Sequence, residues 1–101
     1  MLIASCGNGE VVIIDLLTLG VTQRLNHSGK SARCIDILSA NNEFAVGYSD
    51  NTIRIFDLHT FELKQELDGH EISVFTVRYD QGRKVLVSGS RDARIKLWSY
   101  D

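Results

Sequence analysis

The sequence predicts an all-β fold of antiparallel strands arranged in repeated four-stranded units, and three observations support it. The apolar stretches are short, rich in β-branched residues and bounded by turn residues, as in the stretch from Thr52 to Asp57. The same pattern of residues returns at a fixed interval along the chain. Proline is absent and glycine occurs eight times, so no Pro-rich or Gly/Ser linker divides the chain. One domain, or part of one, follows.

The repeat has a period of 42 residues, since this shift takes Asp15 to Asp57 and Asp57 to Ser99 without a gap. The segments that align are Ile13-Ile14-Asp15-Leu16, Ile55-Phe56-Asp57-Leu58 and Leu97-Trp98-Ser99-Tyr100. Periods of about 40 to 45 residues are typical of four-stranded β-propeller blades. The fold class predicted is therefore an incomplete β-propeller fragment made of antiparallel four-stranded blades.

The period divides the chain into three copies of the unit. Copy one spans about residues 1–27, copy two about 28–69 and copy three about 70–101. In copy two, strands are predicted at residues 33–38, 43–48, 52–57 and 62–67. The copies contribute three, four and three strands in chain order, or about two and a half blades. Because propellers close with at least four blades, we expect the remaining blades from a longer parent chain, or else from other copies.

Turn residues fall between the predicted strands. Between the second and third strands of the unit lie Asn8-Gly9, Asp50-Asn51 and Asp92-Ala93, and between the first and second lie Asn41-Asn42 and Gln81-Gly82. Asn and Gly tolerate the positive φ that tight hairpins require. The fourth strand alternates Phe61, Leu63, Gln65 and Leu67 with charged residues, which predicts an outer strand with one wet face.

Copy three carries residues that resemble the WD40 repeat, a family whose pattern opens with Gly-His and closes near Trp-Asp. The corresponding residues are Gly69-His70 and Trp98-Ser99, with the closing Asp replaced by Ser. Copy two has Ser28 in place of the His, and copy one has Ile14 at the Trp position. The resemblance covers the whole chain and implies a propeller fold.

The resemblance also implies a buried hydrogen-bonded network, at His70, Ser88, Asp92 and Trp98. A carboxylate can accept hydrogen bonds from turn amides and the imidazole, and a hydroxyl can join the imidazole to the indole. His, Ser and Asp are also the members of a nucleophilic triad. However, Ser88 lies in mid-strand without a nucleophile elbow, so we predict no catalytic residue and no enzyme.

By resemblance, partners bind on the rim formed by the loops between copies and the tight turns within them. The matching positions are Ser31, Arg33, Ser49, Ser73, Phe75 and Arg91. Arg and aromatic residues are enriched at interface hot spots. The alternative interpretation for each residue is a solvated loop position.

Two further patterns predict no ligand. Gly29-Lys30-Ser31 is similar to the end of a P-loop, but Arg24 stands where its first glycine belongs. His27, Cys6 and Cys34 lack any known metal-ligand spacing, and the cysteines are expected to be reduced thiols. We therefore predict no metal and no cofactor.

Arg54 and Lys96 occupy the same position in copies two and three. Long basic side chains can cover apolar surface with their stems while the charged heads reach water. We favour this arrangement over a binding role for both residues.

Charge and hydropathy restrict the function. The net charge of −2 is small and evenly spread, so nucleic-acid binding is not indicated. The longest apolar run, Val11 to Ile14, is far shorter than the roughly 20 residues of a membrane span, and no secretory signal is recognised. We expect a cytoplasmic scaffold that presents a propeller rim to protein or peptide partners, with a nuclear location as the alternative. The alternative is a propeller domain of an enzyme or of a chromatin or nucleic-acid-associated complex, with the activity outside this chain.

Overall fold

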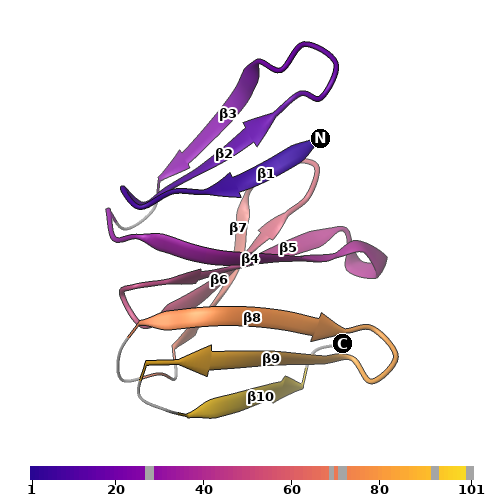
Figure 1. Cartoon of the computed structure of the whole chain (residues 1–101). Coiled ribbons are helices and arrows are strands. Elements are labelled where there is room, and N and C mark those ends of the chain that lie inside the picture. Colours follow the sequence, from indigo (N-terminus) through magenta and orange to yellow (C-terminus); the bar gives the residue numbers. More distant parts are fainter. Residues whose placement is uncertain (27–28, 69, 71–72, 92–93, 100–101) are drawn as a thin grey trace.

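Three antiparallel sheets follow one another along the chain in the computed structural model, which describes residues 1–26, 29–68, 70, 73–91 and 94–99 (Figure 1). The first sheet contains β1 (Leu2–Ser5), β2 (Glu10–Ile14) and β3 (Val21–Asn26). The second contains β4 (Ala32–Leu38), β5 (Glu43–Tyr48), β6 (Thr52–Asp57) and β7 (Leu63–Asp68). The third contains β8 (Val74–Asp80), β9 (Val85–Ser90) and β10 (Ile95–Ser99).

The predicted all-β fold is confirmed. Strands β4 to β7 begin and end within one residue of the prediction, and a short 3₁₀ turn, η1 (Ser39–Asn41), connects β4 to β5. Each sheet is a simple meander, because consecutive strands pair antiparallel in every case. In Figure 1 the three sheets are stacked one above another, and β4 of the second sheet lies next to β8 of the third.

The repeat is also visible in the backbone dihedral angles. Positive φ values recur at equivalent positions, in the pairs Gly9 and Asn51, Leu19 and Phe61, and Asn42 and Lys84. Gly9, Asn51 and Asn42 lie in turns that were predicted from the sequence. In copy three the predicted turn is confirmed at residues 81–84, and Lys84 is the residue in it with a positive φ. Ala93, in the third predicted hairpin turn, lies outside the described residues.

Two apolar clusters join the sheets, and β5 belongs to both because its side chains alternate between its faces. Phe44, Val46 and Tyr48 face the first sheet, where they pack with Val11 and Ile13. The opposite cluster contains Leu38, Ala45, Ile53, Ile55, Val74, Val77 and Leu86. The middle sheet is therefore covered on both faces.

Hydrogen bonds add to the packing between sheets two and three. The Asp36 carboxylate in β4 accepts a bond from the Tyr79 amide in β8 at 2.7 Å. The Gln81 side-chain amide donates to the Ser39 hydroxyl at 3.0 Å. Ser39 and Gln81 are separated by one repeat period, so equivalent positions of adjacent units contact each other.

Strand β7 is the outer strand of the second sheet, and its predicted apolar face is only partly buried. Leu67 packs against the second cluster and Phe61, just before the strand, against the first. Between them, Leu63 is 37% exposed and Gln65 is exposed. The prediction is thus wrong for the middle of the strand.

Candidate functional site

The predicted partner-binding rim lies along one edge of the three sheets. The loops that lead into β4 and β8 and the turns after β1, β5 and β9 all reach this edge, on the left in Figure 1. Strands of a meander reverse direction at each turn, so every second connection lies at the same edge. The six rim positions are therefore close to this edge, but they differ in what their side chains do.

The three serine positions are used mainly for internal bonding. The Ser31 hydroxyl donates to the Gly7 carbonyl at 2.6 Å, and its own carbonyl accepts from the Ser49 amide at 2.9 Å. In the next unit, the Ser73 carbonyl accepts from the Arg91 amide at 3.1 Å and from the Ser90 hydroxyl at 2.8 Å. These bonds attach each loop to the turn beside it, so the serines shape the rim.

Arg33, Phe75 and Arg91 are the exposed members of the set. The Arg33 guanidinium carbon lies 5.4 Å from the centroid of the Phe75 ring, within the range of a cation–π contact. Phe75 is 47% exposed. Arg33 and Phe75 occupy equivalent positions of neighbouring units, on β4 and β8, so the contact joins two sheets.

Three residues of the predicted network lie in hydrogen-bonding contact. The Ser88 hydroxyl oxygen accepts a bond from the Trp98 indole at 2.9 Å and lies 2.7 Å from the His70 Nε2 atom. Strands β9 and β10 position Ser88 and Trp98, because Ser88 pairs with Lys96 and Trp98 with Leu86, which makes Ser88 and Trp98 diagonal neighbours across the hairpin. Asp92, the fourth predicted member, lies outside the described residues.

The burial of this network bears on its chemistry. Ser88 has no exposed surface and His70 is 5% exposed. A nucleophilic serine must reach the carbonyl carbon of its substrate, and this hydroxyl is enclosed by its partners. The arrangement supplies hydrogen bonds that hold β9, β10 and the segment at His70 together.

Arg54 forms a second polar centre, in the middle sheet, and the prediction for its side chain was wrong. The guanidinium carbon lies over the Tyr48 ring, 4.6 Å from its centroid. The head is not in water, because Arg54 is only 8% exposed. It donates to Asp50 at 3.0 Å, to Glu66 at 3.0 Å and to the Thr52 hydroxyl at 2.8 Å.

The electrostatics of this centre favour the charged pair. Burial raises the pKa of Asp50, but hydrogen bonds from Thr52 and Arg54 and the charge of Arg54 outweigh it, so the pKa lies below its ordinary value. Burial lowers the pKa of Arg54, but hydrogen bonds to Asp50 and Glu66 and the charges of these two residues outweigh burial. The pKa of Arg54 is therefore raised above its ordinary value. Burial raises the pKa of Tyr48 to about 12. The Tyr48 hydroxyl has no hydrogen-bond partner among the described residues.

Sequence reasoning missed this centre, although one signal was present. Asp50 matches the turn Asp of the family pattern, but the same unit has Val46 at the position of Ser88 and Phe56 at that of Trp98. A carboxylate without its expected partners requires a different one. Arg54, four residues further on, provides it.

The two thiols are separate and unbridged. Burial raises the pKa of Cys34 to about 11, so the thiolate that would react or bind a metal is disfavoured. Within the described ranges, no three His, Cys, Asp or Glu side chains gather as a possible metal site. His27, considered with these cysteines above, lies outside those ranges.

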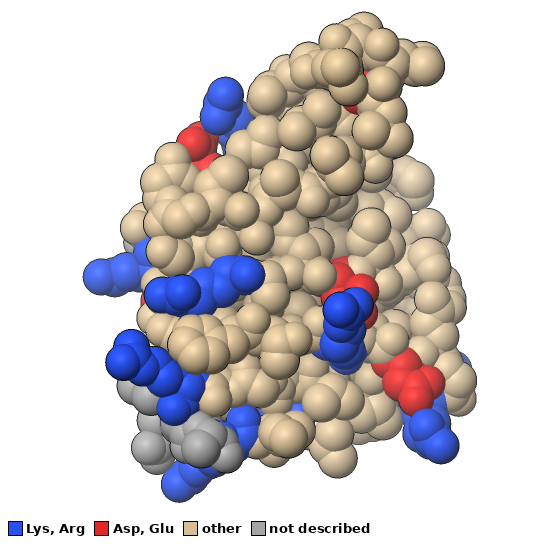
Figure 2. All heavy atoms as spheres, in the orientation of Figure 1, with Lys and Arg blue, Asp and Glu red and all other residues tan. Residues whose placement is uncertain are grey.

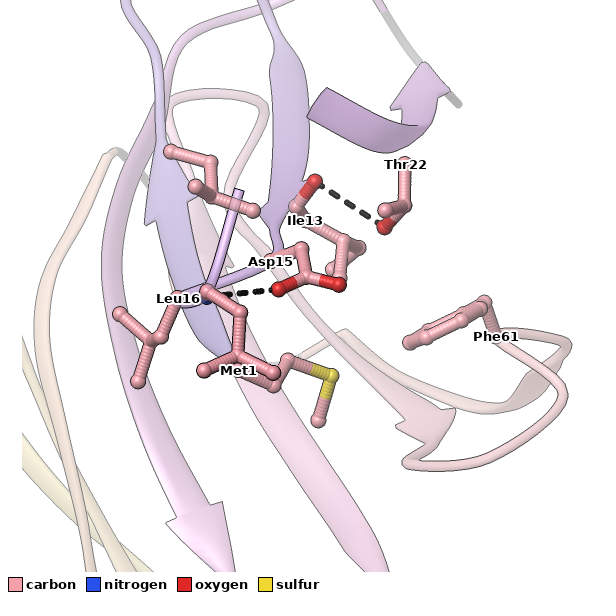
Figure 3. Close-up of a pocket in the computed structure, with 8 residues that line it drawn as sticks. Met1, Ile13, Asp15, Leu16, Thr22 and Phe61 are labelled. Carbon is pink, nitrogen blue, oxygen red and sulfur yellow. Dashed lines mark hydrogen bonds between the residues drawn. The ribbon is translucent and has the colours of Figure 1, made fainter. Parts of the chain in front are cut away.

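A pocket of about 340 Å³ opens at the opposite rim, where the loop after β2 meets Phe61 in the segment before β7 (Figure 3). Its walls are mainly apolar. Its one carboxylate, Asp15, accepts a bond from the Leu17 amide at 2.7 Å, and the Thr22 hydroxyl donates to the Ile13 carbonyl at 3.3 Å (Figure 3). Asp15 is the single titratable side chain among the residues that line the pocket, so the lining offers no acid–base pair.

Comparisons with known proteins agree with this architecture. Residues 20–57 and 61–99 match the family described as WD40: WD domain, G-beta repeat. Topless-related protein 3 of Arabidopsis thaliana is 36% identical over 100 residues, which cover 98% of this chain and 9% of that protein. Protein TOPLESS-RELATED PROTEIN 2 of Oryza sativa subsp. japonica is 28% identical, with the same coverage. The chain thus spans a small part of the length of these relatives.

The fold also matches a solved structure. The crystal structure of the computationally designed Ika4 protein superposes with a TM-score of 0.82 at 22% identity, covering 98% of this chain and 59% of the designed one. Among the residues described, no helix is long and apolar enough to cross a membrane. Because the repeat family matches most of the sequence, the chain belongs to the WD40 repeat family, and each of its sheets is a blade or part of a blade.

Proposed function

We propose that this chain is part of a non-catalytic protein-interaction scaffold whose partners, proteins or peptides, bind on the rim that contains Arg33, Phe75 and Arg91. The observation that supports the proposal is the exposure of these three side chains on a frame of internally bonded serines. Arg and aromatic residues are the types that contribute most to interface affinity. A rigid frame lowers the entropic cost of ordering them when a partner binds.

A structural role for His70, Ser88, Asp92 and Trp98 is part of the proposal. The contacts of Ser88 with His70 and Trp98 support it. An Asp92→Asn substitution in the full-length protein should lower the melting temperature without changing any partner affinity measured below the transition. A lower affinity with an unchanged melting temperature would assign Asp92 to binding instead.

We also propose that further blades cover the open faces of the first and third sheets. Ile53 and Ile55 have no exposed surface between sheets two and three, whereas their equivalents Ile95 and Leu97 are 75% and 71% exposed. A blade following β10 would bury this apolar face as sheet three buries that of sheet two. The blades would come from the parent chain, which fits the length of the relatives.

Location is part of the same proposal. Two unbridged cysteines fit a reducing intracellular compartment, cytoplasmic or nuclear.

Affinity capture with the full-length protein tests the scaffold function. We expect specific proteins to be retained by the wild type and lost with the double substitution Phe75→Ala and Arg91→Ala. Lys84→Ala, on the opposite rim, is the control and should retain them, because Lys84 lies in the turn between β8 and β9. Equal retention by all three proteins would contradict a binding role for this rim.

A further inference from the structure

The rim carries an uneven distribution of charge. Figure 2 shows Lys and Arg side chains gathered along the left edge of the molecule, which is the edge of the rim in Figure 1, with little red among them. Two of the described acids close to this edge have their own partners, and a third, Asp68 at the end of β7, is exposed. Glu10 accepts bonds from Asn8 at 2.8 Å and Arg24 at 3.5 Å, and Asp50 is bound by Arg54 at 3.0 Å.

Arg33 and Arg91 are two exposed cations of the rim. Among the described residues, the ion pairs include neither Arg33 nor Arg91. The Arg91 amide is bonded to the carbonyl of Ser73, two residues before Phe75, which attaches the Arg91 backbone to the start of β8. The sequence also places Glu71 and Asp92 on these loops, and both lie outside the described residues.

The contact with Phe75 orients one of these cations. A guanidinium that packs over a ring still has its N–H groups at the edge of its plane. Those N–H groups form a fork that matches the two oxygens of a carboxylate. The half-exposed ring supplies an apolar surface directly beside the fork. This combination fits a side-chain carboxylate with an apolar neighbour.

The number of cations favours a peptide over a nucleic acid. Proteins that bind the phosphate backbone commonly make about 6 to 10 phosphate contacts. The rim offers a few cations on a chain with a net charge of −2. Short acidic segments need only one or two bidentate contacts, and fixed basic groups favour them through charge complementarity.

We infer that Arg33, Phe75 and Arg91 form a docking surface for an acidic peptide segment of a partner protein. The inference rests on the proposed scaffold function and specifies the chemistry of its partner. Arg33 binds a carboxylate with its fork, Phe75 contacts the apolar part of the peptide, and Arg91 supplies the second positive charge.

Fluorescence anisotropy with the full-length protein tests the inference. The probe is a labelled 12-residue peptide of Glu, Leu, Gly and Ser, compared with the same peptide carrying Gln for Glu, and with an oligothymidylate of equal charge. We expect Arg33→Glu to weaken binding of the Glu peptide by at least about tenfold, because it places like charges together. Arg33→Lys keeps the charge but loses the fork, so a loss of about threefold is expected.

The controls separate this surface from general electrostatics. Lys84→Glu makes the same change of charge on the opposite rim and should alter affinity less than about twofold. Melting temperatures of all variants should match that of the wild type. Equal affinity for the Gln peptide, equal losses for Arg33→Glu and Lys84→Glu, or tighter binding of the oligothymidylate would each overturn the inference.

A failure of the acidic-peptide inference can be distinguished from a failure of the proposed scaffold function. If the captured proteins are lost on substitution of Phe75 and Arg91 but the Glu peptide does not bind, the rim binds partners of another chemistry. If neither result is obtained, the proposed function itself is wrong.

Discussion

In the third blade, the buried Ser88 hydroxyl lies between the His70 imidazole and the Trp98 indole, whereas the second blade has Val46 and Phe56 at the positions of Ser88 and Trp98. Phe56 stacks on Phe44 with ring centroids 5.2 Å apart. The polar contacts of the second blade are instead centred on Arg54, with Asp50 and Glu66 as its acceptors.

The difference between the two blades teaches that the family's signature residues are one way among others to connect the strands of a blade. Both centres bond the third strand of their blade to a neighbouring segment: Trp98 bonds to Ser88 on the second strand, whereas Arg54 bonds to Asp50 in the preceding turn and to Glu66 on the fourth strand. In each case the aromatic residue on the third strand packs toward the core. The shape of the blade is shared, while the bonding chemistry is specific to each copy.

The largest difference between the blades should appear when Arg54 and its equivalent Lys96 are each replaced by Leu. Arg54→Leu leaves the Asp50 carboxylate without its cation at a site where Arg54 is 8% exposed. We expect the free energy of unfolding to fall by about 2 to 4 kcal/mol, as for a broken ion pair near the core. Lys96→Leu should change it by less than about 0.5 kcal/mol. Denaturant unfolding of the full-length protein measures both, and equal effects would contradict the comparison.

The third blade can be converted toward the chemistry of the second with Ser88→Val and Trp98→Phe. Ser88→Val alone should cost about 1 to 3 kcal/mol, because the partly buried Trp98 N–H loses its acceptor. Trp98→Phe should then cost less in the Ser88→Val background than in the wild type, since no N–H remains to be satisfied. A double-mutant cycle measures this coupling. Additive costs would mean that the 2.9 Å bond contributes nothing to stability.

Acid should affect the second blade through Asp50. Because the folded-state pKa of Asp50 is lowered, its contribution to stability is complete above the unfolded value of about 3.9 and is lost as the pH falls through the folded pKa. Asp50→Asn should therefore cost about 1 to 2 kcal/mol at pH 7, and the difference from wild type should shrink below about pH 4. Urea unfolding across this range checks the sign; a difference that grows in acid would contradict it.

The smallest effect is expected for Tyr48→Phe. The Tyr48 hydroxyl is buried without a hydrogen-bond partner in the described part of the chain, so its removal relieves a desolvation cost. The ring beneath Arg54 is retained. We expect stability to stay the same or to rise by up to about 1 kcal/mol in thermal unfolding. A clear loss would show that the hydroxyl is bonded in solution.

The sequence predicted the strands well because their signals are local. Alternating apolar residues and turn residues such as Asn42 and Asn51 mark where each strand of the second blade begins and ends. The environment of Arg54 could not be predicted in this way. Its partner Glu66 is twelve residues away on another strand, and that contact depends on the pairing of β6 with β7.

The sequence predicted the positions of the six rim residues, but it did not predict what each side chain contacts. The six candidates follow from the repeat, and their separation into bonded serines and exposed Arg33, Phe75 and Arg91 required the structure. Pattern alone gives no indication that Arg33 contacts Phe75, because the two residues lie on different sheets.

The contacts between equivalent positions have a consequence for how such repeats diverge after duplication. Ser39 meets Gln81, and Arg33 meets Phe75, each pair one period apart. When a gene segment encoding one blade is copied unchanged, each of these residues faces a copy of itself. An arginine that is duplicated here brings two positive charges to the place where a guanidinium now lies 5.4 Å from a ring centroid, and they repel. A substitution in one of the two copies removes this repulsion, and Phe75 opposite Arg33 is such a difference between neighbouring copies.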